Sequence, residues 1–238
     1  MSRPNTLRKR GGEVIHEEIF SSHRIKAVFL DYTGTMVRDD EPYTMKLLEY
    51  FLTHSDLKEP SKALKVVWGM IKHLEYTCYG ESFIKKDEMV DRILAACVKD
   101  YGLKGDLTYM HELWLNSWIH APLYEDVEPF FRECPLPIYV VTNDDLIYIE
   151  ASLAEKGLKP AGIAAAETVR ACKPHGEIFE LALKMAGVSA SEAVHIGDSV
   201  TSDVEAARAV SVTPILIDRK GTMTMEGVTV IRTLAELS

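Results

Sequence analysis

The chain has 238 residues, of which 47% are hydrophobic and 26% are charged, and its formal net charge is −9. This length allows a well-buried core, either as one large domain or as a core with an inserted smaller one, and the composition excludes a low-complexity or collagen-like chain. The acidic balance argues against a broad nucleic-acid-binding face, although local basic groups can still bind one phosphate.

The N-terminal segment and the cysteines indicate the compartment. Residues 1–24 are expected to form a basic tail, and no apolar segment of a secretory signal follows the basic residues. No segment approaches a membrane-spanning apolar run, so a membrane is not an expected partner. Because of the acidic balance, a nucleic acid is not an expected partner either. Four cysteines lie far apart and form neither a Cys-x-x-Cys pair nor a dense disulfide framework: Cys78, Cys97, Cys134 and Cys172. We therefore expect reduced thiols in a cytoplasmic protein.

The first predicted strand spans residues 25–31 and ends at Asp31. Its apolar run, bounded by the turn signal at Gly34, is typical of a strand in a parallel sheet, and ligands bind outside the carboxyl ends of such strands. Asp31 would then lie at the mouth of a site. The same residue type also caps turns and helices, so this segment alone leaves both interpretations open.

A long helical block follows this strand. The predicted helices cover residues 44–54, 61–77, 85–101 and 106–121. In the second of them the apolar residues recur at steps of three and four, which places them on one face of an amphipathic helix and indicates core packing. We expect residues 37–125 to form a helical cap domain, inserted directly after Asp31, where it can exclude water and select substrates.

Strands and helices alternate in the second half of the chain. The predicted strands cover residues 137–142, 162–166, 193–197 and 213–218. The predicted helices between them cover residues 144–157, 176–186 and 202–210. This alternation predicts an α/β fold, in which helices cover a parallel sheet. Residues 25–36 and 126–238 would together form its core domain.

Polar residues follow the strands that end near 142 and 197, and a lysine precedes the proline that opens the helix between them. They are Thr142, Asn143, Lys173, Asp198 and, five residues after Asp198, Asp203. The ends of these strands would meet in the same crevice as Asp31. Taken singly, each residue also fits a structural role as a helix cap, a turn residue or a solvated charge.

Taken together and in this order, the residues resemble the four motifs of the haloacid dehalogenase superfamily, over nearly the whole chain from about residue 25. The motifs stand here as Asp31-Tyr32-Thr33-Gly34-Thr35, Thr142-Asn143, Lys173-Pro174, and Gly197-Asp198-Ser199 with Asp203. The resemblance implies a Rossmann-like core with a helical cap of the type common in small-metabolite phosphatases. It therefore implies a Mg²⁺-dependent phosphohydrolase that acts on a small phosphorylated molecule.

The resemblance also implies a role for each motif residue in handling the phosphoryl group. Asp31 would attack phosphorus and form an aspartyl phosphate, which divides one hard displacement into two easier ones. Thr142 and the backbone amide of Asn143 would hold the transferring phosphate. Lys173 would offset the charge of Asp31 and of the phosphate, as a fixed cation in a partly dry site.

The remaining motif residues would bind the metal. A site for Mg²⁺ and a phosphoryl group needs oxygen ligands for the metal and donors or cations for the phosphate oxygens. By resemblance, Mg²⁺ would be bound by Asp31, Asp198 and the backbone carbonyl of Thr33. Asp203 would serve as a ligand or as a hydrogen-bonding partner of the ligands.

Thr33 departs from the pattern of the superfamily. Most of its phosphatases carry a second aspartate at this position, which acts as general acid on the leaving group and then as base on water. A positioned acid or base typically supplies about 10²–10⁴ in rate, and a threonine hydroxyl does not replace it near neutral pH. Three consequences stay open: substrates with good leaving groups, an acid borrowed from the cap or from water, or other chemistry.

Other chemistry has three forms within the same resemblance. Phosphonoacetaldehyde hydrolases use a cap lysine as a Schiff-base amine, haloacid dehalogenases need no metal, and a weakly active protein would bind phosphate without efficient turnover. The cap offers six lysines, each expected to be a solvated surface charge: Lys46, Lys62, Lys65, Lys72, Lys85 and Lys86. No particular substrate or oligomeric state is predicted.

Three further features allow a functional and a structural interpretation. The segment Tyr79-Gly80-Glu81-Ser82 is either a substrate-facing turn or an ordinary helix connection. His175 and His195 lie beside motif residues. We expect His175 at the start of a helix and His195 packed beside the sheet, rather than in catalytic roles.

Overall fold

A computed structural model describes residues 24–39 and 42–237. Its core is a six-stranded parallel sheet in the order β3-β2-β1-β4-β5-β6. The strands are β1 (Ala27–Leu30), β2 (Ile138–Thr142), β3 (Gly162–Ala165), β4 (Ala193–Gly197), β5 (Thr213–Ile217) and β6 (Thr229–Ile231). The first strand of the sequence therefore lies in the middle of the sheet, between β2 and β4. Its four residues are all buried, as a strand covered on both faces requires.

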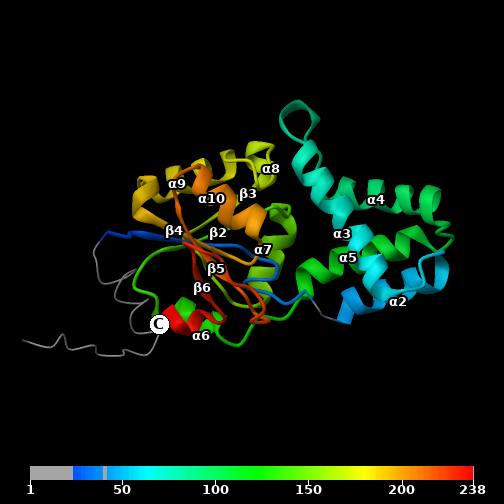
Figure 1. The fold of residues 1–238 in the computed structure, drawn as a ribbon, viewed down its shortest axis with the longest axis horizontal. Helices are drawn as coiled ribbons and strands as arrows, with labels where there is room; N and C mark the ends of the chain where they lie inside the picture. Colours follow the sequence, from blue (N-terminus) through cyan, green and yellow to red (C-terminus); the bar gives the residue numbers. More distant parts are fainter. Residues whose placement is uncertain (1–23, 40–41, 238) are drawn as a thin grey trace, which may run out of the picture.

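Helices cover both faces of the sheet (Figure 1). Successive residues of β1 point to opposite faces, so Val28 and Leu30 belong to one apolar core and Ala27 and Phe29 to the other. The first core contains residues of α6 (Val127–Glu133) and α7 (Leu146–Glu155). The second contains residues of α9 (Glu177–Ala186) and α10 (Ala206–Ala209), and the short α8 (Ala166–Val169) follows β3. The α/β fold class is confirmed.

Four helices between β1 and β2 form a separate bundle beside the sheet (Figure 1). They are α2 (Pro42–His54), α3 (Pro60–Thr77), α4 (Lys86–Tyr101) and α5 (Leu107–His120). Local signals set their ends: a proline begins α3, Gly102 ends α4 at φ 62°, and Asp106 accepts a hydrogen bond from the amide of Tyr109 at 3.1 Å. The bundle has its own apolar core.

The two linkers between bundle and sheet pair with each other. Val37 forms an antiparallel bridge with Leu123, and the amide of Arg38 donates to the carbonyl of Pro122 at 2.9 Å. The amide of Tyr124 donates to the carbonyl of Met36 at 3.0 Å. The helical block thus leaves and re-enters the core through one short two-stranded connection, close to the end of β1.

Every predicted strand and helix is present, with ends shifted by a few residues. The helices α6 and α8 and the edge strand β6 were not predicted. The expected N-terminal tail lies outside the described residues except for Arg24, and the expected domain boundaries stay predictions. All four cysteines are free thiols. Within the described part of the chain, no helix combines the length and the apolar character that crossing a membrane requires.

Candidate active site

The carboxyl ends of β1, β2 and β4 bring most of the predicted residues together. Asp31 directly follows β1, Thr142 ends β2, and Asp198 directly follows β4. Because these three strands are neighbours in a parallel sheet, their carboxyl ends lie side by side. Lys173, from the loop before α9, and Asp203, from the helical turn Val200–Glu205, reach the same place.

Lys173 joins two of the carboxylates in a buried ion-pair cluster. Its Nζ donates to Oδ1 of Asp31 at 2.5 Å and to Oδ1 of Asp203 at 2.6 Å, and its side chain is only 3% exposed. Burial opposes the charge of Lys173, but Asp203 and Asp31 outweigh it and raise the lysine pKa above its ordinary value. The two carboxylates therefore favour the charged form of this lysine.

Asp203 connects Lys173, His195 and Ser199 through its two carboxylate oxygens. Besides Lys173, its Oδ1 accepts a hydrogen bond from Nε2 of His195 at 2.9 Å, and its Oδ2 accepts from the amide of Ser199 at 2.9 Å. Burial would raise the pKa of Asp203, but Lys173 and His195 hold it well below its usual range. His195 is buried in β4 against the ring of Phe179, as expected for a residue packed beside the sheet.

The carboxylates form a set of oxygen donors suited to a hard cation. Asp31, Asp198 and Asp203 each offer an oxygen, and these oxygens lie within 4.8 Å of one another. Burial and the charge of Asp203 raise the pKa of Asp31 to about 6 despite Lys173, and burial with the charges of Asp31 and Asp203 raises that of Asp198 to about 8. Lys173 contacts only two of these three carboxylates, so a divalent cation with a preference for oxygen ligands fits this donor set.

Gly34 makes the close approach of Asp198 possible. Its φ is +84°, a conformation that side chains rarely adopt, and a Cβ at this position would lie 2.5 Å from Oδ2 of Asp198. The turn Thr33–Gly34 thus passes directly over a carboxylate of the cluster.

The hydroxyl of Thr33 is engaged with a residue that was not predicted. Its Oγ1 donates to Oδ2 of Asp144 at 3.3 Å, and Oγ1 of Thr142 donates to the same oxygen at 3.1 Å. The amide of Asp144 in turn donates to Oγ1 of Thr142 at 3.1 Å. Asp144 is buried and follows the motif Thr142-Asn143, which is the only sequence signal that could have identified it.

Asn143 holds the backbone of Lys173 with its side chain. Its Oδ1 accepts from the amide of Lys173 at 2.6 Å, and its Nδ2 donates to the carbonyl of Lys173 at 3.2 Å. The side chain of Asn143 therefore positions the lysine, which leaves the backbone amide of Asn143 as the group predicted to contact phosphate.

A second buried ion pair comes from the cap. Lys86 and Glu75 form a salt bridge, and Nζ of Lys72 lies 3.2 Å from Glu75 and donates to Oγ of Ser202 on the core at 3.0 Å. Burial opposes ionisation of Glu75, but Lys86 and Lys72 outweigh it and lower its pKa to about 2. The expectation that every cap lysine is solvated is wrong for Lys86, which is 7% exposed. It holds for Lys46, Lys62, Lys65 and Lys85, and Lys72 is partly buried.

The segment Tyr79–Ser82 docks against the core. The amide of Gly80 donates to the carbonyl of Arg170 at 2.9 Å, and Nε of Arg170 donates to the carbonyl of Gly80 at 2.9 Å. The ring of Tyr79 stacks on His175, which immediately precedes the first turn of α9, with ring centroids 4.5 Å apart. The structure thus favours the helix connection over the substrate-facing turn.

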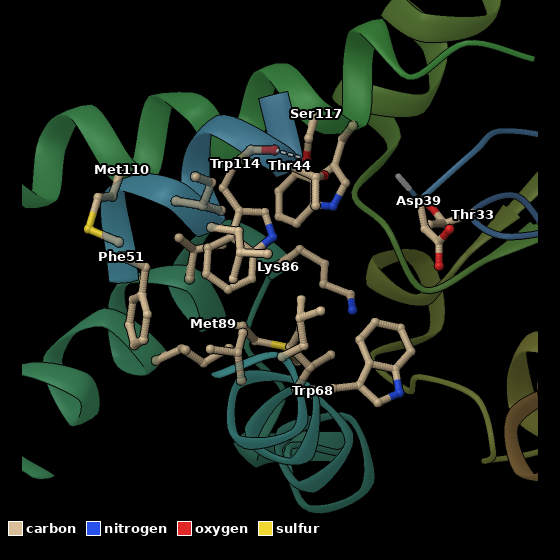
Figure 2. Close-up of a pocket in the computed structure, with 18 of the residues that line it drawn as sticks. Thr33, Asp39, Thr44, Phe51, Trp68, Lys86, Met89, Met110, Trp114 and Ser117 are labelled. Atoms are coloured by element: carbon tan, nitrogen blue, oxygen red, sulfur yellow. Dashed lines mark hydrogen bonds between the residues drawn. The ribbon is translucent and has the colours of Figure 1, made fainter. Parts of the chain in front are cut away.

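A cavity of about 370 Å³ extends from this site into the cap. Thr33, Asp39 and Asp144 line its end at the core, and Phe51 and Met110 line its far end between the cap helices. Figure 2 shows the side chain of Lys86 extending across the cavity toward the end where Thr33 and Asp39 lie. The sequence did not predict this cavity.

The family model described as haloacid dehalogenase-like hydrolase matches residues 25–211. No curated protein sequence matches the chain. Among solved structures, the protein YfnB of Bacillus subtilis, described as a putative HAD-hydrolase bound to magnesium, is 20% identical with a TM-score of 0.73, covering 90% of this chain and 97% of that one.

Two other solved structures are similar over the same share of this chain. The L-2-haloacid dehalogenase of Xanthobacter autotrophicus is 17% identical with a TM-score of 0.70, covering 90% of this chain and 96% of that one. A HAD phosphatase of Thermococcus onnurineus is 23% identical with a TM-score of 0.63 and the same coverage of both chains. At these identities the likeness extends to the fold.

The fold and the family match together define a hydrolase of the α/β type, with a helical bundle between β1 and β2. The chain belongs to the haloacid dehalogenase-like hydrolases.

Proposed function

We propose that the chain is a Mg²⁺-dependent phosphohydrolase that acts on a small phosphorylated metabolite through an aspartyl phosphate on Asp31. One observation carries this proposal: Asp31 accepts a hydrogen bond from a buried ammonium group while its carboxylate lies within reach of the carboxylates of Asp198, which is half-buried, and Asp203, which is buried. A nucleophile, a fixed cation and a set of oxygen ligands for a metal are thus present in one place.

Asp31, Asp198 and the backbone carbonyl of Thr33 would hold the metal. Both oxygens of Asp203 already accept hydrogen bonds, from Lys173 and His195 on one side and from Ser199 on the other. We therefore assign Asp203 to positioning Lys173 and the loop at Ser199. A bound Mg²⁺ would offset the negative charge of the carboxylates and of the phosphoryl oxygens.

The chain's own residues then account for two displacements. A carboxylate oxygen of Asp31 attacks phosphorus, the bond from phosphorus to the leaving-group oxygen breaks, and that oxygen keeps the electron pair. Lys173 orients Asp31 and offsets charge on the phosphoryl oxygens, and the amide of Asn143 holds those oxygens, joined by the hydroxyl of Thr142 when it turns from Asp144 to the phosphoryl group. Water then cleaves the aspartyl phosphate, which restores Asp31 and releases inorganic phosphate.

Position 33 supplies no acid for the leaving group. The hydroxyl of Thr33 donates to Asp144, and a general acid would have contributed about 10²–10⁴ in rate. Turnover therefore favours substrates whose leaving group departs without a proton, such as acyl or aryl phosphates.

Dehalogenation is the second candidate, because several structures with the same fold are L-2-haloacid dehalogenases and a buried aspartate is also a nucleophile for carbon. The three clustered carboxylates favour the metal-dependent reaction. Schiff-base chemistry, as in phosphonoacetaldehyde hydrolases, would need a neutral amine. Burial lowers the pKa of Lys86, but Glu75 outweighs it and raises that pKa above its ordinary value, so this lysine stays charged.

The test measures release of inorganic phosphate from a panel of acyl, aryl and alkyl phosphates, with Mg²⁺ and with chelator, and of halide from 2-chloropropionate. We expect Mg²⁺-dependent phosphate release that Asp31→Asn abolishes and that the exposed control Asp100→Asn leaves unchanged. Phosphate release that survives Asp31→Asn, or halide release without phosphate release, would overturn the proposal. Binding of phosphate mimics with Mg²⁺ but without any turnover would indicate a phosphate-binding protein.

The partner proposed here is the small phosphorylated substrate, with neither nucleic acid nor membrane involved. Four free cysteines support a reducing compartment, and we propose the cytoplasm. Fractionation of the source cells with an antibody against the chain tests the location.

A further inference from the structure

The cavity that begins at Thr33 is mainly apolar along its length. Aliphatic and aromatic side chains from all four cap helices line it, among them Phe51, Val67, Ile93, Met110 and Trp114. Phe51, Ile93 and Met110, at or near the far end, are each less than 5% exposed. All three tryptophans of the chain, Trp68, Trp114 and Trp118, are lining residues.

Polar lining groups come from the core side, such as Thr33, Asp39 and Asp144, and from the cap helices, such as Lys86 and Ser117. Thr33 donates to Asp144, and Lys86 forms its salt bridge with Glu75. Figure 2 shows Thr33 and Asp39 on one side of the cavity, Phe51 and Met110 on the other, and Lys86 between them. A sugar or a nucleoside in the far part would leave hydroxyl groups without partners, which is costly in an apolar cavity.

The volume suits a ring system. A dry apolar cavity of about 150 Å³ is large enough to bind benzene in another protein, and ligand pockets start at about 300 Å³. At about 370 Å³, this cavity has room for one or two fused rings. Aromatic side chains along its wall offer edge-to-face and stacked contacts to such a ring.

The position of the cavity indicates which part of a substrate it would hold. Asp31 lies two residues before Thr33, so a phosphoryl group on Asp31 would lie close to the cavity end that Thr33 and Asp144 line. A leaving group directed into the cavity would find a threonine at position 33, and the nearby Asp144 accepts hydrogen bonds from Thr33 and Thr142, so this end of the cavity favours a leaving group whose oxygen is weakly basic. A phenol meets both conditions, because it is apolar and departs as a stabilised anion.

We propose that the cap cavity binds the leaving group of the substrate and that the substrates are phosphate esters of apolar phenols. This proposal rests on the proposed phosphohydrolase function. Asp31 attacks phosphorus, the bond between phosphorus and the phenol oxygen breaks, and the phenolate keeps the electron pair and takes a proton from water. Hydrolysis of the aspartyl phosphate completes the reaction.

The first test uses the unmodified enzyme with Mg²⁺ and compares kcat/KM across five phosphates. Phenyl and 2-naphthyl phosphate vary the apolar surface, and cyclohexyl phosphate keeps the shape of phenyl phosphate with a strongly basic leaving group. Glucose 6-phosphate is polar, and acetyl phosphate has a good leaving group too small to fill the cavity. We expect 2-naphthyl phosphate to exceed phenyl phosphate by about tenfold and cyclohexyl phosphate by at least about 10³-fold.

Two substitutions on α4 test the cavity itself. Val90 lines the cavity, whereas Val98 lies on the exposed side of the same helix. We expect Val90→Phe to lower the ratio of kcat/KM for 2-naphthyl phosphate to that for acetyl phosphate by about tenfold, and Val98→Phe to leave this ratio unchanged. An unchanged ratio in folded Val90→Phe would overturn the cavity assignment.

A binding measurement gives a readout apart from turnover. In Asp31→Asn with Mg²⁺, p-nitrophenyl phosphate should quench the fluorescence of the tryptophans that line the cavity, and inorganic phosphate should not. Equal turnover of glucose 6-phosphate and 2-naphthyl phosphate, or quenching by neither probe, would overturn the assignment of the cavity to an apolar phenol. The proposed phosphohydrolase function would still stand in that case if the enzyme hydrolysed acetyl phosphate. Failure to hydrolyse acetyl phosphate and every aryl phosphate would instead refute the proposed function.

Discussion

Replacing Lys173 by methionine removes the ammonium group that contacts both Asp31 and Asp203. The two N–O distances of 2.5 and 2.6 Å each correspond to a Coulomb attraction of about 6 kcal/mol at an effective dielectric constant near 20. Much of this offsets the cost of taking three charges out of water, and breaking a buried ion pair typically costs about 3–5 kcal/mol. The carboxylate oxygens left behind lie within 4.8 Å, where each charged pair repels by about 3 kcal/mol or more.

We therefore expect Lys173→Met to lower the free energy of unfolding by about 3–5 kcal/mol at pH 7.5 in the absence of Mg²⁺. Urea denaturation followed by far-ultraviolet circular dichroism measures this, because the signal comes from the helices of both core and cap. The matched control is Lys85→Met. Its side chain is 62% exposed and pairs with Glu167 at the surface, so the loss should stay below about 1 kcal/mol.

The deficit, meaning the loss of unfolding free energy in Lys173→Met, should also depend on pH. Burial and neighbouring carboxylates raise the pKa of Asp31 to about 6 and of Asp198 to about 8, so both gain charge as the pH rises from 5 to 8. Without Lys173 this added charge is uncompensated, and the deficit should be smaller at pH 5 than at pH 8. A deficit no larger than that of Lys85→Met, or one that does not shrink toward pH 5, would refute the reasoning.

Three further substitutions separate the other roles. Thr33→Val keeps the backbone carbonyl but not the donor to Asp144, so kcat for aryl phosphates should stay within about tenfold of the unmodified enzyme; a loss near 10³-fold in a steady-state assay would assign the hydroxyl a chemical role. Glu75, with a pKa lowered to about 2 by Lys86 and Lys72 despite burial, contributes stability that is full above about pH 4.5 and lost as the pH falls toward 2. Glu75→Gln should therefore lower the free energy of unfolding by about 3–5 kcal/mol at pH 7. Between pH 5 and 3, the free energy of unfolding measured by urea denaturation should fall less steeply in this variant than in the unmodified protein. An equally steep fall in both would count against the ion pair of Glu75 with Lys86. Mg²⁺ should raise the melting temperature of the unmodified protein, and Asp198→Asn should remove most of this rise because it lowers the affinity for Mg²⁺ by at least about tenfold. An equal rise in the variant and in the unmodified protein would exclude Asp198 as a ligand.

The sheet was predictable where burial is strong and the run is apolar. The strands β1, β2 and β4 are buried along their whole length and show the apolar runs expected for inner parallel strands. The edge strand β6 has only three residues, two of them half-buried, and gives no comparable run. The helix α6 contains Pro129 near its start and spans only seven residues, too few for a clear helical period.

Part of the site was likewise predictable from the local sequence pattern, and part depends on packing that the pattern does not show. Strand order places Asp31 and Asp198 side by side, so residue types at strand ends were enough to predict that they meet. Lys85 and Lys86 are neighbours in the sequence, yet one is exposed and the other buried, because only the packing of α4 against α3 decides between them. The cavity is of the same kind: apolar stripes on four helices have the same pattern whether the space between them is filled or hollow.

The central place of β1 has a consequence for synthesis of the chain. Val28 pairs with Ile138 on one side and Val194 on the other, and Ile138 leaves the ribosome about a hundred residues later. At translation rates of about 5–20 residues per second, this strand waits roughly 5–20 s for its first partner. The four cap helices contact one another, the first and the last included, and all of them are synthesised before β2, so they can fold meanwhile. Fragments that end within the cap would therefore expose an apolar strand with both edges unpaired, the form most prone to aggregate and to be held by chaperones.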